Sequence, residues 1–365
     1  MKKILCDNLD DIYNEINKDF NSSGEKIKVD LVYAFNGTGK TMISRMFSEK
    51  LEDKVLCFNS MFQDEFIWDN DNFFLTINHN SWITRFIQDQ GLENAIENNF
   101  IMFCGGIIEP SIDLNSRIIE FSVKTQNGYE SDIKVSKAEE NIFIWTIFYT
   151  FIDSMIYELK EDKENRSTNI FDNIKYIIID DPVSSVDDIK IMNIAIKLCE
   201  LIEKINELKS DRFPNILITT HHALFYNTMY NLLNRRNYVK FKSLILTKDE
   251  YNYCLEEKGD SSFGYHLVLV NKISDAIKNN SIEKSHFNMF RILLEKTGNY
   301  FGYKKYEDCL PQKDYTKELI RLVNLYSHGN LPEFEYSELM DNEKNLLIEG
   351  FNDFVTYYKM EVKNE

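Results

Sequence analysis

The spacing of hydrophobic residues predicts alternating strands and helices over the first two thirds of the chain. Residues 25–33 (EKIKVDLVY) alternate in polarity and then become rich in β-formers, which is typical of a strand, and residues 41–54 can form the helix that follows. Residues 55–130 contain short aromatic stretches separated by turns, which predict short strands. The runs IKYIIIDDP at 174–182 and NILITTHH at 215–222 have successive apolar residues, as in strands buried on both faces of a parallel sheet.

Helical patterns occupy the middle and the end of the chain. Residues 135–161 begin with a serine and acidic residues and continue as a long apolar run, which predicts a helix with a defined start. Beyond residue 266 the strand signals fade and amphipathic helical patterns take over, so we place a domain boundary near residues 249–265. The predicted fold is an α/β domain, residues 1–265, followed by a smaller all-α domain, residues 266–365.

Composition and charge narrow the functions open to the chain. With 43% apolar and 13% aromatic residues, its 365 residues can bury a substantial core. The net charge of −17 argues against a surface coated in nucleic acid, although a local basic patch is compatible with it. No apolar run approaches the roughly 18 to 20 residues of a membrane span, and the acidic start does not fit a signal peptide. The six cysteines form no C-x-x-C pair, so we expect a cytoplasmic protein with no zinc site and no membrane partner.

The stretch LVYAFNGTGKTMISRMF at 31–47 has the spacing of a phosphate-binding loop between a strand and a helix. Glycines allow close approach of the backbone, the lysine reaches phosphates and the threonine hydroxyl binds Mg²⁺. Ala34 stands where this motif usually opens with glycine, and alanine fits there if its φ is negative. The predicted nucleotide-binding residues of the loop are Asn36, Gly37, Thr38, Gly39, Lys40 and Thr41.

A second group of motifs completes the predicted nucleotide site. YIIIDD at 176–181 offers Asp180 to hold Mg²⁺ together with Thr41, and Asp181 to orient the attacking water. DDPVSSVDD resembles the Walker B motif and D-loop of ATP-binding-cassette (ABC) ATPases, and TTHH resembles their switch histidine at His221. These motifs predict binding of ATP or GTP with Mg²⁺. Asp181 replaces the usual glutamate, and its shorter reach indicates slow turnover, which suits a switch better than a motor.

VSKAEE at 135–140 resembles the signature motif of the same ATPases, in which a serine begins a helix. In that class the signature of one subunit closes over nucleotide held by the other, so Ser136 would meet the γ-phosphate in trans. This implies a homodimer or a higher homo-oligomer. Ala138 and Glu139 depart from the usual Gly-Gly-Gln, and an ordinary helix N-cap is the alternative interpretation.

Two polar stripes mark the C-terminal helices. In SHFNMFRILLEKTGNYFG the stripe lies opposite Phe287, Phe290 and Leu294, and its members recur at three- and four-residue steps. These members are Lys284, Asn288, Arg291, Glu295 and Asn299. In DYTKELIRLVNLYSHG a second stripe consists of Lys317, Arg321, Asn324 and His328. By themselves the stripes fit either a catalytic site or a solvated salt bridge with a helix-ending histidine.

Five strings, in this order, resemble the PrrC family of bacterial anticodon nucleases over nearly the whole chain: YAFNGTGKT, SKAEENIFIWTIFYT, IIIDDPVSSVDD, ITTHHALFYN and EKGDSSFGYHL. The resemblance implies an ABC-type NTPase head that controls a C-terminal ribonuclease. That ribonuclease cuts tRNA, most often lysine tRNA, in the anticodon loop as part of phage defence. The resemblance also implies dTTP binding and association with a type I restriction-modification complex.

The same resemblance implies a catalytic set of Arg291, Glu295 and His328. Arg321 and His328 are also similar to the R-x(4–6)-H pattern of HEPN ribonucleases, so both arginines are candidates for contacting the phosphate. Cleavage by attack of the 2′-hydroxyl needs a base, an acid and a cation, and it needs no metal. It leaves a 2′,3′-cyclic phosphate and a 5′-hydroxyl, with either Glu295 or His328 as the base.

Two further stretches bear on tRNA recognition. KGDSSFGY at 258–265 resembles the family's anticodon-recognition peptide, which implies that Asp260, Ser262 and Tyr265 select the tRNA; a turn closing a hairpin is the alternative. Residues 234–248 hold five Lys or Arg and no acid, a basic strip that fits either tRNA contact or a solvated surface. The alternative function is an ABC or SMC-like ATPase subunit of a defence or DNA-repair complex whose nuclease is a separate protein. An SMC-like ATPase predicts long heptad arms between the Walker motifs.

Overall fold

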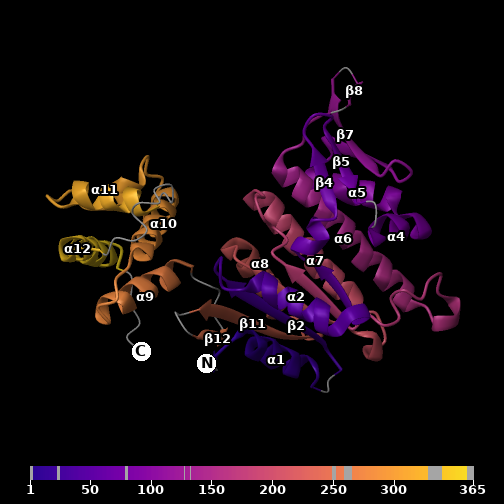
Figure 1. The fold of residues 1–365 in the computed structure, drawn as a ribbon, viewed down its shortest axis with the longest axis horizontal. Coiled ribbons are helices and arrows are strands. Elements are labelled where there is room, and N and C mark those ends of the chain that lie inside the picture. The colour runs from indigo at the N-terminus through magenta and orange to yellow at the C-terminus, as the bar shows by residue number, and fades with distance from the viewer. Residues whose placement is uncertain are drawn as a thin grey trace. The chain divides into compact units, whose positions relative to one another are not determined.

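The computed structural model (Figure 1) describes residues 3–22, 25–78, 81–126, 128–131, 133–248, 252–258, 265–327 and 339–359. It divides into two compact units, Met1–Phe263 and Gly264–Glu365, here called the head and the tail. Each unit contains its own set of buried apolar residues, so each is described by itself.

A seven-stranded sheet forms the centre of the head, in the order β1-β12-β11-β2-β10-β9-β3 (Figure 1). Five of its strands run parallel, and the other two pair antiparallel at one edge. The parallel strands are β11 (Val239–Lys248), β2 (Ile27–Ala34), β10 (Asn215–Thr220), β9 (Tyr176–Asp180) and β3 (Val55–Phe58), and the edge strands are β12 (Tyr253–Lys258) and β1 (Lys3–Cys6). All of β9 and all but the first residue of β10 are buried, which confirms the prediction for the two apolar runs.

Helices cover both faces of this sheet. α1 (Leu9–Phe20) and α2 (Lys40–Leu51) share one apolar cluster with Val32 and Ala34 of β2. On the opposite face the ring of Tyr226, in α8 (Ala223–Leu233), contacts the ring of Tyr33, and α7 (Asp188–Ile205) packs against α8. The alternation of side chains along β2 therefore decides which helix each residue meets.

A second, antiparallel sheet also belongs to the head. Its strands are β4 (Phe66–Asp69), β5 (Phe74–Ile77), β7 (Ile118–Thr125) and β6 (Ile108–Asp113), and β8 (Gly128–Glu130) pairs with β7. These strands confirm the prediction for residues 55–130, but that segment also holds the helices α3 (Ser60–Gln63), α4 (Trp82–Gln90) and α5 (Glu93–Cys104), which were not predicted. In α4 the Ser81 hydroxyl accepts from the Ile83 amide, and the buried Ile83, Phe86 and Ile87 recur at helical spacing.

The longest helix of the head, α6 (Lys137–Lys160), is long and apolar enough by length and composition to cross a membrane. This corrects the expectation that no run approaches that length. However, 83% of its most apolar 18-residue stretch is buried inside the head. The rings of Trp145 and Phe148 pack against Phe58, and Phe148 also contacts Phe62, so α6 serves as a core helix.

The tail consists of helices, as predicted for residues after 266. They are α9 (Tyr265–Lys278), α10 (Lys284–Phe301), the short η4 (Tyr306–Cys309), α11 (Thr316–Ser327) and α12 (Asp341–Tyr357). Phe287, Phe290 and Leu294 of α10 are fully buried, which confirms the predicted apolar face. A Cβ atom added at Gly350 of α12 would lie 2.1 Å from the Leu319 side chain, so glycine is needed where α12 meets α11.

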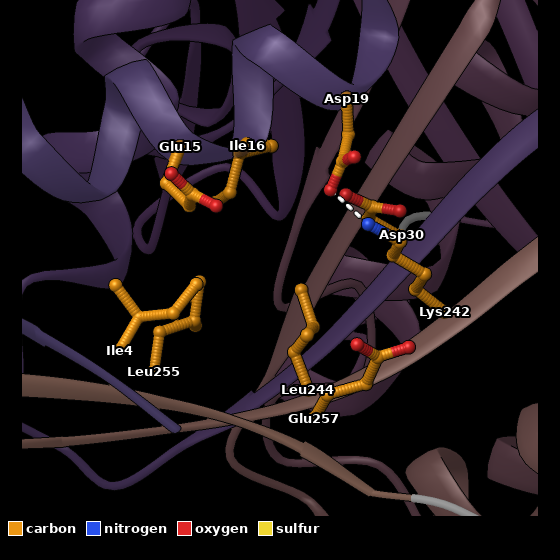
Figure 2. Close-up of a pocket in the computed structure, with 9 residues that line it drawn as sticks. All are labelled: Ile4, Glu15, Ile16, Asp19, Asp30, Lys242, Leu244, Leu255 and Glu257. Carbon is orange, nitrogen blue, oxygen red and sulfur yellow. Dashed lines mark hydrogen bonds and ion pairs between the residues drawn. The ribbon is translucent and has the colours of Figure 1, made fainter. Parts of the chain in front are cut away.

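The face of the sheet beneath α1 contains a buried carboxylate (Figure 2). Asp30 lines a cavity of about 20 Å³, and in the described part of the chain its Oδ2 atom has no hydrogen-bond partner. Lys242, its neighbour on β11, instead forms an ion pair with Asp19 of α1. Burial raises the pKa of Asp30 to about 7, with Lys242 opposing the shift and Asp19 and Glu257 adding to it.

We expect Asp30→Asn to change how stability depends on pH. The folded pKa of about 7 lies above the ordinary value of 3.8, so between these values the folded state holds a proton that the unfolded state has released. The stability from this proton is complete below about pH 4 and is lost as pH rises through 7. Asp30→Asn should therefore raise the melting temperature more at pH 8 than at pH 5, by at least about 2 °C. Asp71→Asn, at an exposed turn, is the control, and equal shifts at both pH values would contradict the assignment.

Candidate functional site

The phosphate loop joins the end of β2 to the start of α2. Gly37 and Gly39 have φ angles of +80° and +96°, which favour glycine. A Cβ atom at Gly39 would also lie 2.8 Å from the end of the Leu9 side chain, so a larger residue would need Leu9 to shift as well as a strained backbone. Ala34 is the last residue of β2 and does not have a positive φ, so alanine is compatible with this loop.

Lys40 is buried at the start of α2, and its ammonium group contacts oxygen atoms of the phosphate loop. Its Nζ atom donates to the carbonyl oxygens of Ala34 (3.3 Å) and Phe35 (3.4 Å) and to Asn36 Oδ1 (3.4 Å). The Thr38 hydroxyl donates to the Phe35 carbonyl at 2.6 Å. The three contacts of Lys40 are long, so the ammonium can exchange them for phosphate oxygens at little cost.

Asp180 ends β9 beside the start of α2 and is held by two hydroxyl groups. The Thr41 hydroxyl donates to Oδ2 at 2.8 Å, and the Thr219 hydroxyl donates to Oδ1 at 2.5 Å. Burial raises the pKa of Asp180, and the two hydroxyls and the charge of Lys40 oppose this shift. Thr41 and Asp180, predicted as the magnesium ligands, therefore lie in direct contact. In the described ranges no group of three His, Cys, Asp or Glu side chains could hold a metal by itself.

Asp181 leaves the strand in a left-handed conformation, with φ +55°. Its carboxylate forms an ion pair with His221 Nδ1, and Oδ1 accepts from the Thr220 hydroxyl at 3.2 Å and from the His221 amide at 3.4 Å. Burial alone would raise the pKa of Asp181, but the His221 hydrogen bond and the charges of His221 and Lys40 hold it below its usual value. His221 thus keeps Asp181 ionised and fixes the direction of its carboxylate. A group that orients water needs both properties.

Ser136 is the N-cap of α6 and is exposed. Its hydroxyl accepts from the Glu139 amide at 3.3 Å, and the Glu139 carboxylate accepts from the Ser136 amide at 2.7 Å. This is a capping box, the arrangement expected for the N-cap interpretation. The same exposed helix start is the geometry that a contact with a second subunit would need.

The tail brings the two polar stripes together through Tyr306. On α10, Arg291 Nε donates to Glu295 Oε1 at 2.7 Å. The guanidinium carbon lies 5.6 Å from the centre of the Tyr306 ring, a cation–π contact. The Tyr306 hydroxyl donates to Asn324 Oδ1 of α11 at 2.7 Å. Arg321 is the other candidate for contacting the phosphate. It lies on α11, three residues before Asn324, and its side chain is exposed.

Comparison with known proteins assigns the family. No family model matches the chain. The curated anticodon nuclease of Escherichia coli is 34% identical over 96% of this chain and 94% of its own length. The chain belongs to the anticodon nuclease family. This confirms the resemblance on which the tail assignments depend.

Other relatives of this anticodon nuclease family member cover less of it. An uncharacterized chromosomal cassette SCCmec protein of Staphylococcus aureus is 35% identical over 34% of this chain and 16% of its own length. Two solved SMC head structures, one from Thermotoga maritima and one bound to the C-winged helix domain of ScpA, are 10% and 9% identical, with TM-scores of 0.34 and 0.33. They cover 65% of this chain and 92% and 91% of their own chains. The head itself is a mixed α/β domain with a phosphate loop at the end of β2, as predicted.

Several predicted residues of the anticodon nuclease chain lie outside the described residues. These are His328, Asp260 and Ser262; the side chain of Tyr265, which begins α9, belongs with them. The basic strip stays a prediction; of its lysines, Lys242 pairs with Asp19, and Lys240 Nζ donates to the Ser22 hydroxyl at 3.3 Å. These two lysines bind residues at the C-terminal end of α1, where positive charge complements the helix dipole.

Three polar residues of these sites were not predicted. Thr219 and Thr220 hold Asp180 and Asp181, and Tyr306 bridges the tail stripes. The string TTHH contained a signal for the threonines, because hydroxyls just before the switch histidine end a strand beside the Walker B strand. Tyr306 follows no helical pattern, and only the folded tail reveals it.

We expect Thr219→Val to lower the stability of the head and to weaken its magnesium-dependent binding of nucleotide. Valine has the same shape as threonine but leaves the buried Asp180 with one donor fewer. Loss of such a bond should cost about 1–3 kcal/mol of unfolding free energy, measured by urea denaturation without nucleotide. Thr219→Ser keeps the donor and should retain most of the stability and nucleotide affinity. Wild-type behaviour of Thr219→Val in both measurements would show that this bond is dispensable.

Proposed function

We propose that the chain is an NTP-regulated endoribonuclease that cuts tRNA, most often lysine tRNA, in the anticodon loop in the course of phage defence. The observation that carries the proposal is the relationship to the anticodon nuclease of E. coli over nearly the whole of both chains. The contact of Arg291 and Glu295 with the second stripe, through Tyr306, supports it. A cytoplasmic location agrees with this substrate.

The tail residues supply the groups that RNA transesterification requires. The 2′-hydroxyl attacks the adjacent phosphorus, either Glu295 or His328 takes its proton, and the other protonates the departing 5′-oxygen. An arginine offsets the charge that develops on the phosphate oxygens. Arg291 is held in place by Glu295 and Tyr306, whereas Arg321 is exposed, so Arg291 is the better oriented of the two. The products are a 2′,3′-cyclic phosphate and a 5′-hydroxyl, and no step calls on a metal.

The head acts as the switch in this proposal. The loop amides and Lys40 hold the phosphates of ATP or GTP, Thr41 and Asp180 hold Mg²⁺, and Asp181 with His221 orients water. Bound Mg²⁺ would neutralise phosphate charge. Ser136 of a second copy closes the site, which makes the homodimer or a higher oligomer the active form. dTTP and a type I restriction-modification complex are the further regulators that the family relationship suggests.

The SMC-like form of the alternative, a DNA-repair ATPase, requires long helical arms between the Walker motifs, whereas a defence ATPase with a separate nuclease does not. Between α2 and α6 the described residues instead form strands of both sheets and short helices, of which α5 has 12 residues. The head therefore lacks, in that described interval, the feature that this alternative predicts.

Lys40→Ala should abolish nucleotide binding and, because nucleotide closes the dimer, should also lower tRNA cleavage. Binding is measured with a fluorescent nucleotide and cleavage with purified lysine tRNA. Lys50→Ala, on the same helix but in a surface ion pair with Asp10, should behave as wild type. Unchanged nucleotide affinity in Lys40→Ala would refute the site assignment.

His328→Ala should lose cleavage while keeping nucleotide binding. A general acid or base contributes about 100- to 10,000-fold to the rate, so kcat should fall by that much. His286→Ala removes a histidine of the same tail whose Nδ1 accepts from the Glu283 amide, and its kcat should stay near wild type. Mass analysis of the RNA ends completes the test, since a 3′-hydroxyl product would contradict the mechanism.

A further inference from the structure

The far ends of α10 and α12 carry aromatic side chains that the tail does not bury. Tyr300 is 84% exposed, Tyr357 65%, Phe301 53% and Tyr303 37%. Aromatic residues normally contribute large areas to cores and interfaces, so several exposed together mark a contact surface. We call these four residues the aromatic platform.

The rings of the platform order one another. The Phe301 ring lies 5.1 Å from Tyr300, edge-on, and 6.0 Å from Tyr303, stacked. Tyr358, which packs on the buried Phe354, lies 5.3 Å from Phe301 and 5.0 Å from Tyr357, and so joins the two helix ends. Ring faces are thus held in place before any partner arrives, which lowers the entropy cost of binding.

Lysines lie beside the platform although the chain carries −17 overall. Residues 296–305 contain three lysines, Lys296, Lys304 and Lys305, and no Asp or Glu. All three lysines are exposed. Glu295 directly precedes this segment and forms an ion pair with Arg291, and of the acids that follow it in η4, Glu307 and Asp308, the second accepts from the Lys305 amide. Lysine is depleted at protein–protein interfaces, so this combination favours a polyanion that also offers flat rings.

The platform lies close to the proposed nuclease residues. Tyr303 precedes Tyr306 by three residues, which span at most about 10 Å. That is the length of about three stacked nucleotides. Tyr306 in turn contacts Arg291.

We propose that the aromatic platform stacks unpaired RNA bases next to the cleaved phosphodiester, while Lys304 and Lys305 bind the neighbouring phosphates. The inference rests on the proposed nuclease function and adds the surface that holds the substrate. Anticodon-loop bases can be unstacked and laid on aromatic side chains, whereas paired bases cannot. The platform would contribute affinity and would leave base selection to other residues, since every base has a face that stacks.

The test is binding of a fluorescent single-stranded oligoribonucleotide and of an anticodon stem-loop, measured by anisotropy. Tyr300→Ala should weaken binding about 5- to 150-fold, the effect of losing one stacked base. Tyr300→Trp keeps a ring and should restore affinity. Tyr157→Ala removes a tyrosine of the head that is 73% exposed, and should bind as wild type. Abasic probes should bind Tyr300→Ala and wild type equally.

The outcomes separate this inference from the nuclease proposal. RNA binding that depends on Tyr300, in a chain that cuts no tRNA, supports the platform and overturns the nuclease. For a chain that does cut tRNA, we expect Tyr300→Ala to raise KM and leave kcat unchanged. Unchanged RNA affinity in a folded Tyr300→Ala, Tyr357→Ala double variant overturns the platform. A changed oligomeric mass with unchanged RNA affinity also overturns it, because the surface would then serve a protein partner.

Discussion

Parallel pairing of β2, β10 and β9 is the constraint on which the nucleotide site depends. Backbone hydrogen bonds set Val32 opposite Thr219 and Thr219 opposite Asp180. The carboxyl ends of the three strands therefore meet at one edge, where the phosphate loop, the two aspartates and the switch histidine all emerge. No single side-chain contact could gather groups that are 139 residues apart in the chain, as Thr41 and Asp180 are.

The sequence predicted this edge well because its signals are local. Successive apolar residues indicate buried strands, and glycines at fixed offsets indicate a phosphate loop, whatever the rest of the chain does. The helices α4 and α5 were missed because aromatic residues fit strands and helices alike, and packing decides between them. The contacts of the basic strip could not be predicted for a related reason. Charge in the sequence does not say that Lys242 will turn towards Asp19.

The tail shows the same division between local and long-range information. Arg291 and Glu295 are one helical turn apart, so their contact follows from spacing alone. Their link to α11 does not, because it needs Tyr306, which belongs to a separate short helix. Residues that join two elements carry no periodicity of their own, and tertiary structure is the first level at which they become visible.

The left-handed backbone at Asp181 has a consequence for which residues the end of the Walker B strand can accept. In this region of φ and ψ a residue with a Cβ atom pays roughly 1–2 kcal/mol, and Asp and Asn tolerate it best because their short side chains bond to nearby backbone. Here the carboxylate of Asp181 accepts from the amide of His221, which the sheet brings beside it although it lies 40 residues further along the chain. A glutamate, the usual residue at this position in ABC ATPases, would add a methylene and move its carboxylate away from the His221 amide and ring. The left-handed backbone at Asp181 and its short side chain are therefore coupled. Lengthening the side chain without also changing this backbone conformation would misplace the carboxylate.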